Sequence, residues 1–139
     1  MNSHELEKPN YTTFSGLVRH ASVIREGNFA LLTHDILITT GDFANPKIVR
    51  TDVYDHHFTW VSSVSDHPQG TINLLHTVPL NDAIYQQLIK VSSGQRVTIR
   101  GAEVLRIEAY KPDGTLISYW QDSSCNTLVV TSVDNQAEN

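Results

Sequence analysis

The chain has 139 residues, of which 40% are hydrophobic and 18% charged, and its formal net charge is −5. This size and composition predict one soluble globular domain that can bury a core without disulfides or metal ions. The acidic balance disfavours binding of nucleic acid or anionic membranes, because both require lysine and arginine to neutralise phosphate groups. Cys125 is the single cysteine, which excludes an intrachain disulfide and a cysteine-rich zinc site.

The first ten residues are polar and contain no apolar stretch that would predict a signal peptide or a membrane span. Together with the single cysteine, they favour a cytoplasmic location. We expect residues 1–10 to form a flexible N-terminus, residues 11–133 a single β-rich domain, and residues 134–139 a flexible tail.

Short strands are predicted along the first half of the chain. Residues 11–24 alternate in polarity as a strand does, and the turn residues 26–28 lead into residues 29–32, so these two segments are expected to form a hairpin. Loops rich in glycine, proline and aspartate separate the further strands, which we expect at residues 36–38, 48–54, 58–64 and 72–78.

One helix is predicted near residues 81–92. Asn81 is a favourable N-cap, Asp82 suits the positive end of the helix dipole, and Gly94 marks a stop just beyond the last turn. The apolar residues recur at helical spacing and form one stripe: Ile84, Tyr85, Leu88, Ile89 and Val91.

Residues 94–133 predict a three-stranded meander. The turn Lys111-Pro112-Asp113-Gly114 joins strands at residues 105–110 and 115–121, and a third strand follows at residues 127–133. Gly101 interrupts an alternating segment, which indicates a β-bulge.

This order of elements predicts an α+β domain that is mostly β: a small curled antiparallel sheet or barrel, OB-like or SH3-like, with one helix near residues 81–92. Strands 48–54 and 127–133 carry few of the lysines and prolines that protect sheet edges. We therefore expect a homodimer or a larger closed assembly.

Several short motifs follow one another along most of the chain: Phe14–Val18, Thr33–Phe43, Trp60, His76 with Pro79, Gly94–Val104, Gly114, Trp120, Ser123, Ser124 and Cys125. Their order resembles a family of small uncharacterised bacterial proteins. The resemblance implies a shared fold, but no established activity and hence no chemistry.

A metal site was considered at Asp52, Asp55, His56 and His57, since imidazole and carboxylate groups bind zinc or iron. Neighbouring residues of an extended chain point to opposite faces, so this spacing is better explained by a solvated turn. We therefore expect the protein to have no cofactor and to bind no divalent metal tightly.

His76 shares its strand parity with apolar residues and should be partly buried. It could act as a general base with an aspartate in a small-ligand enzyme, but a structural histidine is the better interpretation, because no second catalytic group can be placed beside it. Cys125 is interpreted as a small structural hydrophobe.

The aromatic residues suggest a binding surface made of Trp60, His76, Tyr110, Tyr119 and Trp120. Tyrosine and tryptophan could stack bases in an oligonucleotide-binding barrel, with Arg96, Arg100 and Arg106 along the backbone path. Neighbouring acidic residues cancel these charges. We therefore expect a non-enzymatic interaction module that binds a protein partner or itself, with both tryptophans mostly buried, and no nucleic-acid partner.

Overall fold

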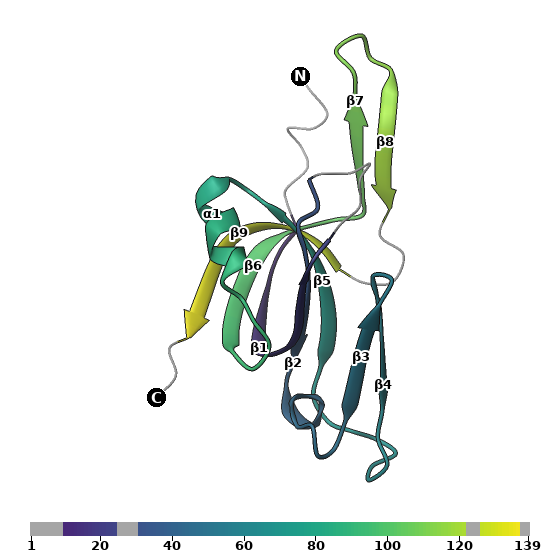
Figure 1. Ribbon diagram of the computed structural model, residues 1–139, viewed down its shortest axis with the longest axis vertical. Helices are drawn as coiled ribbons and strands as arrows, with labels where there is room; N and C mark the ends of the chain where they lie inside the picture. The colour runs from purple at the N-terminus through teal and green to yellow at the C-terminus, as the bar shows by residue number, and fades with distance from the viewer. Residues whose placement is uncertain (1–9, 25–30, 122–125, 137–139) are drawn as a thin grey trace.

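The computed structural model describes residues 10–24, 31–121 and 126–136 (Figure 1). The strands are β1 (Asn10–Val23), β2 (His34–Thr39), β3 (Arg50–Tyr54), β4 (His57–Val61), β5 (Ile72–Pro79), β6 (Arg96–Val104), β7 (Arg106–Tyr110), β8 (Leu116–Gln121) and β9 (Asn126–Gln136). A short 3₁₀ helix, η2 (Gly41–Ala44), follows β2, and the helix α1 (Asp82–Ile89) follows β5.

Five of these strands close into a barrel in the order β1-β2-β5-β9-β6. The neighbouring pairs are antiparallel except β5 and β9, which run parallel. A small five-stranded barrel with this Greek-key order is the OB fold. The prediction of a mostly β domain with an OB-like barrel and one helix near residues 81–92 is therefore confirmed.

The barrel interior holds the main hydrophobic core. Alternate residues of the strands point inward, and α1, which follows β5 in the chain, packs Ile84 and Leu88 against the same core next to β5 and β9. The buried members are Val18, Ile36, Ile38, Leu75, Ile84, Leu88, Val91, Val97, Ile99, Leu128 and Val130. In the part of the chain that the structure describes, no helix is long and apolar enough to span a bilayer.

The strands β2 and β5 are buried on both faces. Ile36, Ile38 and Leu75 point into the core, whereas their neighbours Leu37 and Leu74 lie on the opposite face and are also fully buried. The hairpin β3–β4 lies beside these two strands in Figure 1 and covers this outer face. Burial on both faces explains why β2 reads as a continuous apolar run rather than as an alternating strand.

The predicted meander at residues 94–133 is only partly correct. The turn at residues 111–114 forms, with the Gly114 amide donating to the Lys111 carbonyl at 2.9 Å, and β7 pairs with β8. However, β9 pairs with β6 and β5 and not with β8, so β7–β8 is a separate two-stranded hairpin. Pairing of β9 with a distant strand depends on contacts that local sequence patterns do not encode.

The bulge predicted at Gly101 is present, because the register of β6 against β9 shifts between Arg100 and Gly101. A Cβ atom on Gly101 would lie 2.2 Å from the Val129 carbonyl oxygen, so only glycine allows this close approach. Strand β9 continues to Gln136, beyond the expected domain end at residue 133. The predicted turn at residues 26–28 lies outside the described residues, and β1 pairs with β2 at residues 34–39.

Barrel closure changes the argument for self-association. The predicted edge strand at residues 127–133 belongs to β9, which is paired on both sides. The strand β3 pairs with β4 on one side. Open sheet edges in the barrel therefore no longer support a dimer.

The helix N-cap provides a first test. The Asn81 side chain accepts a hydrogen bond from the Ile84 amide at 2.9 Å, as its sequence position predicts. We expect Asn81→Ala to lower the free energy of unfolding by about 1 kcal/mol, measured by urea denaturation. Asn81→Asp keeps the acceptor and should retain most of the stability, and equal stability of all three proteins would contradict this role.

Candidate functional site

Two hairpins are inserted into the barrel connections. The hairpin β3–β4 lies between the second and third barrel strands, and β7–β8 lies between the fourth and fifth. Figure 1 shows β7–β8 extending away from one end of the barrel and β3–β4 lying along its side. The tip of β3–β4 meets the base of β7–β8, since the rings of His56 and Trp120 are 5.6 Å apart.

The turn of β3–β4 directs His56 toward the barrel. Asp55 and His56 are the two residues between the paired positions Tyr54 and His57, and their φ angles are 50° and 62°. Two consecutive positive φ angles are typical of a type I′ hairpin turn, which favours Asn-Gly or Asp-Gly. Histidine at the second position is less favourable for the backbone than glycine.

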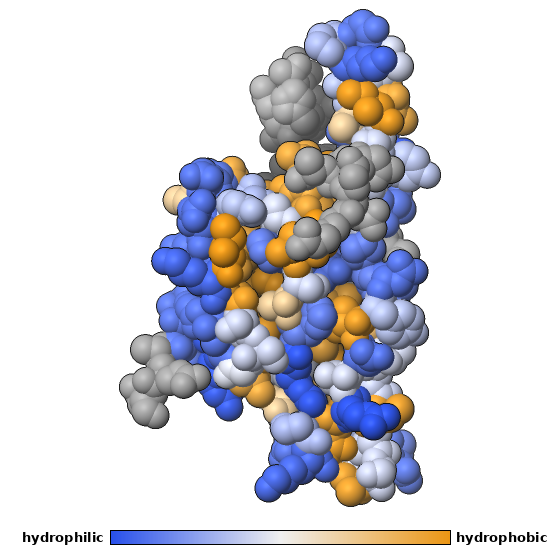
Figure 2. All heavy atoms as spheres, in the orientation of Figure 1, coloured by the Kyte–Doolittle hydropathy of each residue, from blue (hydrophilic) through white to orange (hydrophobic). Residues whose placement is uncertain are grey.

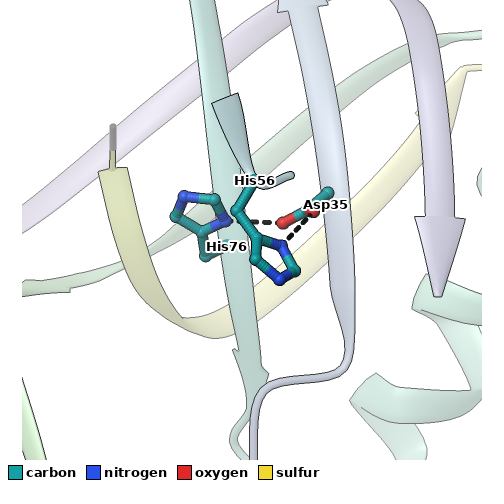
Figure 3. A group of neighbouring side chains, drawn as sticks. All are labelled: Asp35, His56 and His76. Atoms are coloured by element: carbon teal, nitrogen blue, oxygen red, sulfur yellow. Dashed lines mark hydrogen bonds and ion pairs between the residues drawn. The ribbon is translucent and has the colours of Figure 1, made fainter. Parts of the chain in front are cut away.

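The His56 side chain reaches a buried carboxylate on the outer face of the barrel. Its Nδ1 donates to Asp35 Oδ2 at 2.8 Å, and Nδ1 of His76 donates to Asp35 Oδ1 at 2.5 Å. Figure 3 shows both imidazoles next to the carboxylate, each joined to it by a dashed line. Asp35 and His76 are a cross-strand pair of β2 and β5, and they are only 5% and 2% exposed.

Trp120 of β8 covers this group. Its ring lies edge-on to His76 at 5.2 Å and to His56 at 5.6 Å, and its indole Nε1 donates to Thr127 Oγ1 at 2.9 Å. We call Asp35, His56, His76 and Trp120 the Asp35 cluster. It joins both hairpins to the barrel strands β2, β5 and β9.

The electrostatics of the cluster favour an ionised carboxylate. Burial by itself raises the pKa of Asp35. The hydrogen bonds from His76 and His56 and the attraction of both imidazoles together lower it by more than burial raises it. The net result is a pKa below the ordinary value of 3.8. A negative charge thus remains at the centre of the cluster at neutral pH.

The structure separates most of the considered metal ligands. Asp52, Asp55 and His57 are exposed on the hairpin, and only His56 turns toward the barrel. Cys125 lies outside the described residues. Asp35 was missed as a partner of His76 and His56, although an aspartate inside the apolar run of residues 35–38 was a visible signal, because a charge in such a run needs a buried partner.

His76 lies beside Asp35, and a small-ligand enzyme that uses His76 as a general base would need such an aspartate. At 2% exposure it offers a substrate little access. Grooves lie elsewhere, on β3–β4 and the segment before it. One of them, of about 430 Å³, is lined by Arg50, Thr51, Asp52, Thr59, Trp60 and Val61.

Exposed aromatic rings lie on both hairpins. The prediction that Trp60 is mostly buried is wrong: it is 39% exposed and meets Phe43 edge-on at 5.2 Å, whereas Trp120 is partly buried. Tyr119 on β8 is 55% exposed, and the Arg106 guanidinium lies 3.9 Å above its ring. Tyr110 and Tyr54 are exposed as well. Apolar side chains also lie on the surface of β7–β8, as Figure 2 shows, and include Leu116 and Ile117.

No family model matches the chain, and no curated protein matches it either. Solved structures do resemble it. The mitochondrial single-stranded DNA binding protein Rim1 of S. cerevisiae has a TM-score of 0.46 at 9% identity, covering 96% of this chain and 100% of that chain. The Plasmodium falciparum SSB in complex with ssDNA has a TM-score of 0.44 at 9% identity, covering 99% and 100%.

A small single-stranded DNA-binding protein from Streptomyces coelicolor has a TM-score of 0.42 at 6% identity, covering 94% of this chain and 95% of that chain. At these identities the likeness concerns the fold. All three resembling proteins are single-stranded-DNA-binding proteins. Two of our predictions, a protein-partner module and the exclusion of nucleic acid, disagree with this finding.

The physical reason for the correction lies in how charge is distributed. Residues 47–61 and 106–121, which contain the hairpins, each hold two basic and two acidic residues, so both are neutral. The net charge of −5 lies elsewhere in the chain. A whole-chain charge balance therefore says little about the surface that these hairpins present.

The depressed pKa of Asp35 predicts a pH-dependent stability. Replacing Asp35 with asparagine should lower the free energy of unfolding at pH 7 by about 2 to 3 kcal/mol, because charged hydrogen bonds are lost. A carboxylate whose pKa is lower in the folded state stabilises the fold above its unfolded pKa, and this stabilisation disappears as pH falls through the folded pKa. The difference between the proteins should thus be full above about pH 4 and shrink in stronger acid.

Urea denaturation of both proteins from pH 7 to pH 2, in buffer with a chelator, measures this difference. Asp52→Asn serves as the matched control, because Asp52 is an exposed carboxylate on β3. A difference between wild type and Asp35→Asn that stays constant over the whole pH range would contradict the assignment.

Proposed function

We propose that this protein binds single-stranded nucleic acid by stacking bases on the aromatic residues of its two hairpins. The observation that carries the proposal is the presence of exposed aromatic rings on both hairpins of an OB barrel. In OB folds, oligonucleotides bind at the face of the second and third strands and at the adjoining loops. The structures that resemble this chain are also single-stranded-DNA-binding proteins.

The proposed surface runs over the hairpins because the usual strand face is covered. In this chain the second and third barrel strands are β2 and β5, and their outer face is buried beneath β3–β4 and Trp120. The two hairpins meet at the Asp35 cluster and extend from it in different directions (Figure 1). A single strand can follow this path from the groove beside Trp60 to the ring of Tyr119.

Tyr119 and Arg106 together form a surface on which a base can stack. Arg106 lies over its ring and is itself held by Glu108 at 2.6 Å and by Gln121 at 3.3 Å. An arginine plane and an aromatic ring are both surfaces on which an unpaired base can stack. Because bases in a duplex are already stacked on each other, this chemistry favours single strands.

The balance of charge on the hairpins makes stacking the main source of affinity. Lys47 and Arg50 at β3–β4, and Arg106 and Lys111 at β7–β8, can each contact a phosphate. An equal number of acidic residues in the same segments opposes them. The protein should therefore lack the strong phosphate attraction of basic DNA-binding proteins.

The first test of this proposal uses the aromatic residues. We expect Trp60→Ala and Tyr119→Ala each to weaken binding of a labelled 20-nucleotide oligothymidylate by roughly tenfold, since stacking contributes about 1 to 3 kcal/mol per base. Fluorescence anisotropy measures the dissociation constants, and the same assay with oligouridylate and with duplex DNA compares the ligands.

Tyr119→Phe keeps the ring and should bind like the wild type. Lys90→Ala, on the exposed surface just after α1, is the control for a change away from the hairpins. The proposal is wrong if single strands do not bind at about 100 µM protein, or if both alanine variants bind as tightly as the wild type.

The salt dependence provides a second test. Each phosphate contact contributes about −0.7 to the slope of log K against log salt concentration for single strands. With about two to four contacts, the slope should lie between about −1 and −3. A slope steeper than about −5 would show that phosphate contacts dominate, and would contradict a stacking-based interface.

A further inference from the structure

The Asp35 cluster contains three groups that bind transition metals. We propose that Asp35, His56 and His76 form a binding site for one divalent transition-metal ion, with zinc as the best fit. Two imidazoles and one carboxylate are a ligand set that zinc accepts, and three protein ligands leave one position for water. Of the four residues considered from the sequence, this site uses only His56, because Asp52, Asp55 and His57 are exposed on the hairpin. The proposal thus departs from our expectation of no metal.

The three ligands converge although they come from distant parts of the chain. One potential ligand atom from each residue lies within 4.8 Å of the other two. Both Nδ1 atoms point at the carboxylate, at 2.5 and 2.8 Å. In a tetrahedral zinc site, neighbouring ligand atoms are roughly 3.3 Å apart. Small movements of the side chains, in which each nitrogen withdraws slightly from the carboxylate oxygens, would allow that spacing.

The turn of β3–β4 supports a specific role for His56. The position has a φ of 62°, where glycine is favoured, so a histidine there destabilises the hairpin relative to glycine. The charged hydrogen bond from His56 to Asp35 already compensates part of this cost, and a metal bond would compensate it more strongly. The neighbouring His57 lies on the exposed side of the hairpin.

The surroundings of the ligands also suit a metal. Asp35 and His76 are buried, and Trp120 packs against both imidazoles, which limits the access of water. A dry shell strengthens the attraction between a carboxylate and a cation. On binding, the Nδ1 proton of a neutral imidazole would move to Nε2, and a doubly protonated ring would release one proton to solvent. The Nδ1 lone pair would then bind the metal. Because acid protonates this nitrogen, the affinity for metal should fall at low pH.

A metal at this site would link the hairpin β3–β4 to the barrel strands β2 and β5 through coordinate bonds. This consequence does not depend on nucleic-acid binding. The protein could therefore bind single-stranded nucleic acid without binding metal, or bind metal without binding nucleic acid.

The test uses protein prepared without a histidine tag and freed of metal by a chelator. Isothermal titration calorimetry with zinc chloride at pH 7.5 should show one ion bound per chain. His56→Gly removes a ligand but places the favoured residue in the turn, so the variant should fold. Its affinity for zinc should fall by at least about a hundredfold, because loss even of groups behind the ligands costs up to that factor.

His57→Ala is the matched control, since it removes the adjacent exposed histidine and should leave zinc binding unchanged. Titration with Co²⁺ adds a spectroscopic measurement: the visible absorption that a tetrahedral cobalt site produces should appear in the wild type and in His57→Ala, and not in His56→Gly. The proposal is overturned if the wild type binds no zinc, or if His56→Gly binds zinc as tightly as the wild type.

Discussion

The position of both hairpins depends on the buried carboxylate of Asp35. A charged group on a barrel strand is costly to bury, and here two imidazoles satisfy both of its oxygens. His76 comes from the neighbouring strand β5, whereas His56 comes from the tip of an inserted hairpin. The carboxylate therefore does more than complete a strand pair, because it fixes the hairpin β3–β4 on the outside of the barrel.

This arrangement changes which surface of the OB barrel is open. The outer face of β2 and β5 corresponds to the face that binds oligonucleotides in other OB folds, but the chain covers it with its own residues. The proposed contact surface is accordingly displaced from the strands to the hairpins. Aromatic rings such as Trp60 and Tyr119 are exposed there, and the groove of about 430 Å³ lies beside Trp60.

In the proposed binding surface, exposed aromatic rings contribute more to ligand affinity than charge does. The net charge of −5 argues against a phosphate-binding surface, yet the hairpin segments are neutral and rich in exposed rings. Pairing of Arg106 with Glu108 leaves the guanidinium plane over Tyr119 while reducing its effect at long range. Such a surface suits ligands that are recognised by flat unpaired bases more than by phosphate charge.

The sequence by itself determined the features that depend on neighbouring residues. The N-cap at Asn81, the turn at Gly114 and the bulge at Gly101 follow from side-chain hydrogen bonding and from the allowed φ angles of glycine, which act over a few positions. The apolar periods and the order of the elements predicted a mostly β domain, a curled sheet or a barrel, with one helix.

Only the tertiary structure decided how distant segments pair. Strand β9 pairs in parallel with β5 and pairs with β6 across a bulge. In the Asp35 cluster, His56 and His76 are 21 and 41 positions from Asp35 along the chain. The exposure of Trp60 likewise depends on where the hairpin lies against the barrel. These contacts are selected by strand register and packing over the whole fold, and a periodic pattern within one strand shows which face is apolar but not which segment will cover it.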